Sequence, residues 1–302
     1  MRFFDFLLML VLFALLACGM YFLWLNLPAE PTEFEKYVAE LSFELPNQSS
    51  QFHANMRYPD RKISYHLSNN CSLKKRNDFL DAVEFLESRT ILDFYESSMP
   101  EIVVSCSNIA PEPSEEGHFV AGEGGPSVII NASRYAVIFV GKIALYRPEV
   151  CDTPQVAVHE LLHALGFDHN ANPESIMYPV TDCGQKLDQN LIDEIRELYS
   201  VPSAADLLIE SFEANKTGRY LSFETVIANY GLKRVEESVL KIIVDDSVLK
   251  EFDTESLEIG SRKTLTISNL KVPRSMDMVK LVIETSEAEI TRENNAAEIK
   301  VV

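Results

Sequence analysis

The chain has 302 residues, of which 46% are hydrophobic and 24% charged, and its formal net charge is −19. This length allows two modest domains, and the composition is typical of a globular protein. A surface with such an excess of carboxylates repels phosphate groups, which argues against nucleic acid as a partner.

The first apolar segment, Phe6–Leu25, contains no charged residue and is long enough to cross a bilayer as a helix. Arg2 precedes it and glutamates follow it, so the positive-inside rule predicts that residues 1–5 are cytoplasmic and the chain beyond Pro28 is outside. We interpret the segment as an uncleaved signal anchor in the cell membrane. A cleaved signal peptide is the alternative, although its apolar region is usually shorter. "LLAC", ending at Cys18, also loosely resembles a lipoprotein cleavage box.

Four of the five cysteines lie in the part of the chain expected outside the membrane. That location favours disulfides, and no C-x-x-C spacing indicates a zinc site. Three connectivities are open, and we favour the one in which each bond closes a short loop. It pairs Cys71 with Cys106 and Cys151 with Cys183.

Residues 26–55 are polar and acidic and are expected to form a stalk. Over residues 56–201 the patterns predict strands in "KISYHL", "EIVVSCS", "SVIIN" and "YAVIFVGKIALY", with an amphipathic helix after the first and two helices after the last. Within the first helix, Lys74–Arg76 is expected on a solvated face. This order predicts an α+β domain with a mixed sheet.

A glycine-rich stretch, "GEGG" at Gly122–Gly125, precedes the third predicted strand. It is either an edge to which an extended substrate adds as a β-strand, or a flexible loop.

Residues 204–302 form short alternating runs separated by turn residues, without a helical pattern. They predict an all-β sandwich of the immunoglobulin type.

The stretch "HELLHALGFDHNANPESIMYP", residues 159–179, begins on a predicted helix. Thr153 is the expected N-cap, and Pro154 is expected at the first helical position. Gly166 can adopt the left-handed conformation that ends a helix.

His159 and His163 are four residues apart, so a helix presents both on one face. The turn at Gly166 lets His169 return toward them. Three neutral imidazoles and a water make a catalytic zinc site, in which Glu160 acts as general base toward the water.

The alternative is an amphipathic helix that carries histidines by chance, since HExxH alone is a frequent sequence. Three of the six histidines of the chain fall at the H-E-x-x-H-x-x-G-x-x-H spacing, and Met177 follows. The zinc site accounts for this combination better than coincidence does.

These residues resemble the metzincin clan of zinc endopeptidases, and "HELLHALGFDH" with "IMYP" is most similar to its matrixin branch. The resemblance implies a five-stranded mixed sheet, about three helices and a Met-turn. It implies His159, His163 and His169 as zinc ligands, Glu160 as base, Met177 as the Met-turn residue, and Tyr178 and Pro179 as the wall of the primed-side specificity pocket. Asn170 departs from the serine usual after the third histidine. Residues 28–55 contain no cysteine, so we expect no cysteine-switch latency, and we assign no calcium site.

The last part of the chain resembles CARDB domains through "VIANYG", "LEIGSRKTL" and "ENNAAEIKV". That resemblance implies a binding or spacer module that contacts a cell-surface protein. The sequence therefore predicts a membrane-anchored, outward-facing zinc endopeptidase acting on a protein or peptide. The alternative is an adhesion or scaffolding protein whose zinc is structural.

Overall fold

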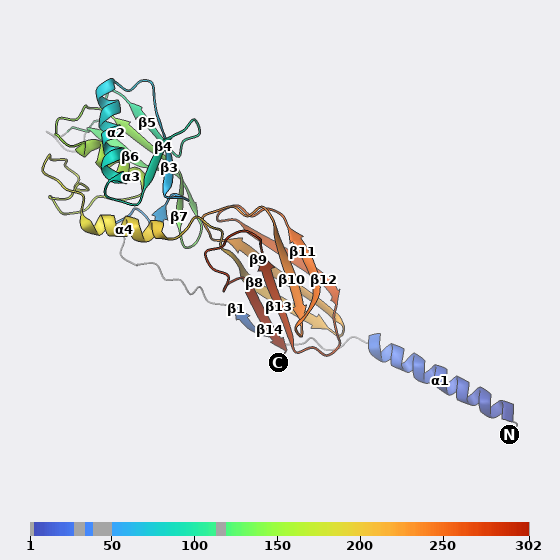
Figure 1. Ribbon diagram of the computed structural model, residues 1–302. Coiled ribbons are helices and arrows are strands. Elements are labelled where there is room, and N and C mark those ends of the chain that lie inside the picture. The colour runs from blue at the N-terminus through green and yellow to red at the C-terminus, as the bar shows by residue number, and fades with distance from the viewer. Residues whose placement is uncertain (1–2, 27–33, 39–49, 113–118, 302) are drawn as a thin grey trace.

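The computed structural model describes residues 3–26, 34–38, 50–112 and 119–301. A long N-terminal helix, an α+β domain and a β-sandwich make up this part of the chain (Figure 1). The predicted fold class, with helices and a mixed sheet followed by an all-β sandwich, is confirmed.

The N-terminal helix α1 (Phe3–Asn26) is apolar around its whole circumference. Its segment Phe6–Leu23 has a mean hydropathy of 2.6, and none of it is buried inside the protein. By length and composition α1 can cross a membrane, a property that an anchor shares with a signal sequence. Cys18 is exposed on this helix.

The α+β domain is built on a mixed sheet in the order β2-β7-β5-β3-β4, with β6 paired to β7. Only the β6–β7 pairing is antiparallel. The strands are β2 (Met56–Arg57), β3 (Lys62–Leu67), β4 (Asp93–Glu96), β5 (Ile102–Cys106), β6 (Gly122–Asn131) and β7 (Ala136–Leu145). The sheet thus has the five expected strands and the two-residue β2 in addition.

Three helices accompany this sheet, namely α2 (Leu73–Glu87), α3 (Gln155–Ala164) and α4 (Gln189–Ser200). Each contributes fully buried apolar side chains to one common core with the strands, such as Phe79 from α2, Leu161 from α3 and Ile195 from α4. The burial of α3 is nearly complete, and its polar residues are therefore held in fixed surroundings.

The start of α3 differs from the expectation. Pro154 occupies the N-cap position with ψ 59° and the helix begins at Gln155. Thr153 does not cap it, because its hydroxyl accepts a hydrogen bond from Gln155 Nε2 at 2.9 Å. The carboxylate of Glu149 instead accepts the backbone N–H of Val156 at 2.9 Å.

The sandwich consists of two sheets. The strands β8 (Leu207–Thr217), β9 (Tyr220–Asn229) and β12 (Arg262–Lys271) form one, and β10 (Ser238–Val244), β11 (Ser247–Thr254), β13 (Met278–Glu284), β14 (Ala296–Val301) and β1 (Phe34–Val38) form the other. The inclusion of β1, antiparallel to β14, corrects the assignment of residues 26–55 to a stalk. At the other end of that range, Gln51 pairs with Phe167 of the α+β domain.

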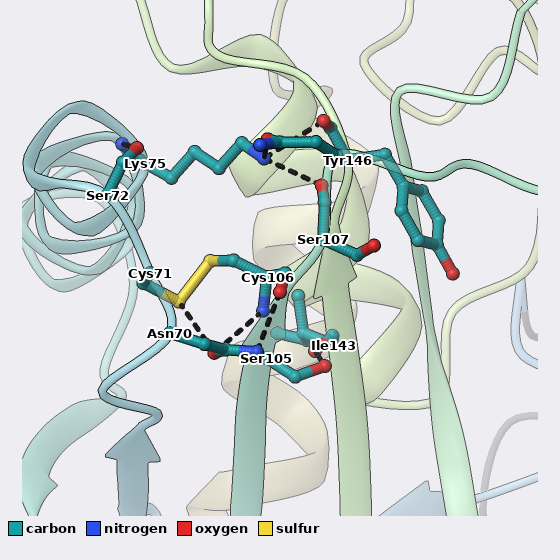
Figure 2. Close-up of a disulfide and its surroundings, with 10 residues drawn as sticks. Asn70, Cys71, Ser72, Lys75, Ser105, Cys106, Ser107, Ile143 and Tyr146 are labelled. Carbon is teal, nitrogen blue, oxygen red and sulfur yellow. Dashed lines mark hydrogen bonds between the residues drawn. A yellow bond between two sulfur atoms is a disulfide. The ribbon is translucent and has the colours of Figure 1, made fainter.

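Two disulfides join Cys71 to Cys106 and Cys151 to Cys183, in the pairing expected from the sequence. The first links the segment before α2 to the end of β5 (Figure 2). The second links the segment before α3 to the loop that follows Met177, so the loop that it closes contains residues 159–179.

Candidate active site

The three histidines of the sequence motif come together at the end of α3. His159 and His163 lie on the helix, and the chain then turns at Gly166, whose φ is +99°. A Cβ at Gly166 would lie 2.6 Å from Cγ of Met56, so both the backbone conformation and the space require glycine. This turn brings His169 back beside the other two.

The Nε2 atoms of the three imidazoles converge on one point. They are 2.9 Å apart between His159 and His163, 3.0 Å between His163 and His169, and 3.1 Å between His159 and His169. The Nδ1 atoms of His159 and His163 lie 2.6 and 2.7 Å from the backbone oxygens of Ile176 and Phe167. A carbonyl can only accept, so each Nδ1 carries the proton and each neutral ring turns an unprotonated Nε2 inward.

Two inward lone pairs cannot bond to each other, and a shared cation satisfies them. A tetrahedral zinc ion with ordinary Zn–N bonds has ligand nitrogens about 3.3 Å apart, close to the spacing here. Burial lowers the pKa of His159 to about 4 and also lowers the pKa of His163 and His169. The residues present therefore fit a zinc ion, and they form a group of potential ligands among the described residues.

Glu160 lies beside the first ligand and is only 6% exposed. Burial raises the pKa of its carboxyl group to about 8, and the nearby Glu123 contributes to the shift. The strand β6 passes directly over it. A Cβ at Gly122 would lie 2.6 Å from Cγ of Glu160, and one at Gly124 would lie 2.1 Å from its backbone oxygen.

The "GEGG" stretch is thus the start of an edge strand, and the interpretation as a flexible loop is wrong. Its two glycines permit the close approach of β6 to α3. Glu123 lies between these two glycines in the sequence. The Tyr146 hydroxyl donates a hydrogen bond to the Glu123 carboxylate at 2.5 Å and so holds this side chain in place. The sequence shows the glycines but not their neighbour, so their role beside Glu160 could not be derived from it.

Lys75 stabilises the same corner of the domain, against the expectation of a solvated face. It is 3% exposed, and its ammonium donates to the backbone oxygens of Ser107 at 2.7 Å and Tyr146 at 2.9 Å, and to Oδ1 of Asn108 at 3.0 Å. Figure 2 shows the lysine reaching from α2 past the disulfide to Tyr146.

Met177, 1% exposed, is buried in the loop that follows the three histidines. Its backbone oxygen accepts the N–H of Asn170 at 2.9 Å, which joins the methionine turn to the residue that follows His169. Tyr178 lines a pocket of about 410 Å³ with Val180 and other residues of the following loop. Pro179 is exposed and is not among the residues that line this pocket.

Phe52 is a residue of the site that the sequence did not indicate. Its ring stacks on that of His163 with the centroids 5.7 Å apart, and its N–H donates to the backbone oxygen of Gly166 at 2.9 Å. Asp168 N–H donates to the backbone oxygen of Ser50 in the same way, at 2.8 Å. The end of the expected stalk is therefore part of the metal-site wall.

Comparison with known proteins finds a family model that matches the α+β domain. Residues 55–200 match the family model described as matrixin. Stromelysin-1 of Mus musculus and that of Rattus norvegicus are each 42% identical to this chain over 66 residues, which are 20% of this chain and 14% of either relative. The chain therefore matches only a small part of the length of these relatives.

Solved structures similar to the chain include two of the CARDB domain of a Pyrococcus furiosus protein. They have 17% and 21% sequence identity and a TM-score of 0.28, and each covers 32% of this chain. The comparison covers 87% of one of these solved chains and 93% of the other.

Proposed function

We propose that this chain, whose residues 55–200 form a matrixin-family domain, is a zinc-dependent endopeptidase with an intact active site. The observation that carries the proposal is the convergence of the Nε2 atoms of three histidines, one of which is followed in the chain by a buried carboxyl group. His159, His163 and His169 are the ligands. A structural zinc site is usually closed by four protein ligands, whereas three leave one position open.

When bound, zinc supplies a water of lowered pKa and polarises the carbonyl of the scissile bond. Glu160 follows the first ligand and serves as the proton acceptor toward the attacking water. It then donates that proton to the leaving amine nitrogen. Burial under β6 keeps bulk water from the carboxyl group.

The substrate in this proposal is an extended segment of an external or cell-surface protein. Within the described residues β6 is paired only with β7, so its other edge can take up a peptide as an additional strand beside Glu160.

The location in the proposal is the outer face of the cell membrane, with α1 as an uncleaved anchor. The length and hydropathy of α1 support it, as do the two disulfides, because such bonds persist in oxidising surroundings outside the cytoplasm. The sandwich serves as a module that contacts a surface protein.

The test compares the full chain with its Glu160→Ala variant. Both are purified in detergent, loaded with zinc and assayed on unfolded casein. Because general acid–base catalysis contributes about 10²–10⁴-fold, we expect the variant to lose at least about 100-fold in kcat/KM while it retains one zinc per chain.

Equal turnover by the two forms would exclude this mechanism. Absence of turnover in the wild type, with zinc bound, would favour the adhesion or scaffolding alternative.

A further inference from the structure

The hairpin between β6 and β7 is the part of the α+β domain that packs on the sandwich. Its residues Ala132, Tyr135 and Val137 are at most 1% exposed and form a small apolar cluster with Leu232, which follows β9. This cluster is separate from the main cores of the two domains. It joins the tip of an active-site strand to the sandwich.

A buried ion pair crosses the same contact. Nη1 of Arg134, in the hairpin turn, lies 3.2 Å from Oδ2 of Asp206 at the start of the sandwich, and these side chains are 6% and 0% exposed. The other oxygen of Asp206 accepts a hydrogen bond from Nδ2 of Asn294 at 3.1 Å. Within this contact, the pair favours the arrangement that keeps the two charges together over other packings of the domains, in which either charge would be buried without the other.

The loop at Gly260 packs against the last residues of β6. A Cβ at Gly260 would lie 2.8 Å from Cγ2 of Ile130 and 2.9 Å from the backbone oxygen of Asn131. Gly260 also has φ +70°, which glycine adopts without strain. Gly260 therefore lies directly against the side chain of Ile130 and the backbone of Asn131.

One buried residue of the sandwich holds both contact points in place. Oδ1 of Asn229 accepts the N–H of Asp206 at 3.2 Å, and its backbone oxygen accepts the N–H of Gly260 at 2.9 Å. Its Nδ2 donates to the backbone oxygen of Leu257 at 3.1 Å. Asp206 and the Gly260 loop thus form one rigid surface against the hairpin.

The strand β6 connects this surface to the active site. Asn131 pairs with Ala136 at the hairpin end, and Gly122 pairs with Leu145 at the other end, where β6 covers Glu160. Pairing with β7 continues between these two ends, with register shifts between Pro126 and Ile129, so a displacement at the hairpin is carried along β6 toward the edge beside Glu160.

We propose that the sandwich contributes to the activity of the peptidase domain. Asp206 and Gly260 are positioning residues that fix β6 against α3 and thereby set the affinity of the active site for an extended substrate. The effect on substrate affinity rests on the proposed function. The effect on the position of β6 does not, because it can be measured without turnover.

The test uses the full chain in detergent with Gly260→Val as the principal variant. Gly218→Val is the matched control, because Gly218 also has positive φ (62°) but lies in the β8–β9 turn. Leu207 and Asn229 pair at the domain-contact end of this hairpin and Thr217 and Tyr220 at its far end. Arg134→Met combined with Asp206→Asn is a second variant, which removes the ion pair without leaving a buried charge.

Three quantities are measured for each form: the amide hydrogen exchange of residues 122–131, the zinc content, and the kinetics of cleavage of an extended peptide. Gly260→Val and the double variant are expected to speed exchange in this segment and to raise KM about threefold or more, with kcat and zinc content close to wild type. Gly218→Val should match wild type in this segment.

Unchanged exchange and KM in both contact variants would overturn the proposal, as would the same change in Gly218→Val. If the wild type cleaves no peptide, the proposed function fails, and exchange of residues 122–131 alone decides whether the sandwich positions β6.

Discussion

At the scale of residues, the carbonyl groups behind His159 and His163 determine the state of their metal-facing nitrogens. Ile176 supplies one of these oxygens and Phe167 the other. Both come from the loop between Gly166 and Met177, so the segment that returns His169 also orients the two helical ligands. Such outer partners fix the tautomer and the ring direction, and they raise the affinity for metal.

His169→Ala tests the third ligand. Loss of an outer partner costs about 10–100-fold in metal affinity, so loss of a ligand should weaken zinc binding by more than about 100-fold. Competition with a chromogenic zinc chelator measures the affinity. His66→Ala is the control, because His66 is exposed on β3 and outside the ligand group. Wild-type zinc affinity in His169→Ala would refute the assignment.

The burial of Lys75 is a feature that the sequence pattern alone did not predict. Charged residues beside each other on a helix are usually solvated, and its neighbour Lys74 is indeed exposed, with a side-chain exposure of 57%. The oxygens that accept from Lys75 come from residues 32, 33 and 71 positions later in the chain. No local pattern predicts partners so distant.

At the scale of elements, β6 is the strand whose role the structure revises most. A Gly-Glu-Gly-Gly run followed by proline is typical of a loop. Here Pro126 is tolerated because β6 is an edge strand, and the glycines admit α3. The predictions for the buried strands "KISYHL" and "YAVIFVGKIALY" agree with β3 and β7, because alternation and apolar content reflect burial in a sheet directly.

Gly124→Ala tests the close approach of β6 to α3. The added methyl would meet the backbone oxygen of Glu160, which cannot move without the helix, so we expect a loss of about 1–3 kcal/mol in the free energy of unfolding. Urea unfolding followed by circular dichroism measures it. At Gly125 a Cβ has nothing within 4 Å, so Gly125→Ala is the neighbouring control. Equal stability of the two variants would contradict the contact.

At the scale of the whole molecule, two separate parts of the chain contribute strands to the sandwich. The strand β1 precedes the α+β domain and pairs with β14, and β8 returns to the sandwich after α4. Arg57 stabilises the end of α4 and the segment that leads to β8. Its Nη1 donates to the backbone oxygen of Val201 at 3.1 Å, and its guanidinium packs on Tyr199. The α+β domain is therefore inserted between two strands of the sandwich, an arrangement that suits the coupling proposed above.

Membrane attachment is tested on the full chain expressed in cells. Burial of an uncharged apolar helix in lipid is strongly favourable, so the chain should stay in the membrane pellet after an alkaline carbonate wash. A variant without residues 3–26 should be released. Amino-terminal sequencing distinguishes the alternatives, because a mature chain that begins after residue 26 would identify a cleaved signal sequence and contradict the anchor.

The sequence alone singled out the three histidines that converge, the helix that carries two of them together with Glu160, and the two domain types. These follow from spacing and periodicity, which depend on the local backbone and on which side chains avoid water. The tertiary structure decided that β1 joins the sandwich, that Phe52 covers His163, and that the "GEGG" strand lies on Glu160 at one end and against the sandwich at the other. These features depend on contacts between segments far apart in the chain, and no local preference encodes which distant surface a segment will meet.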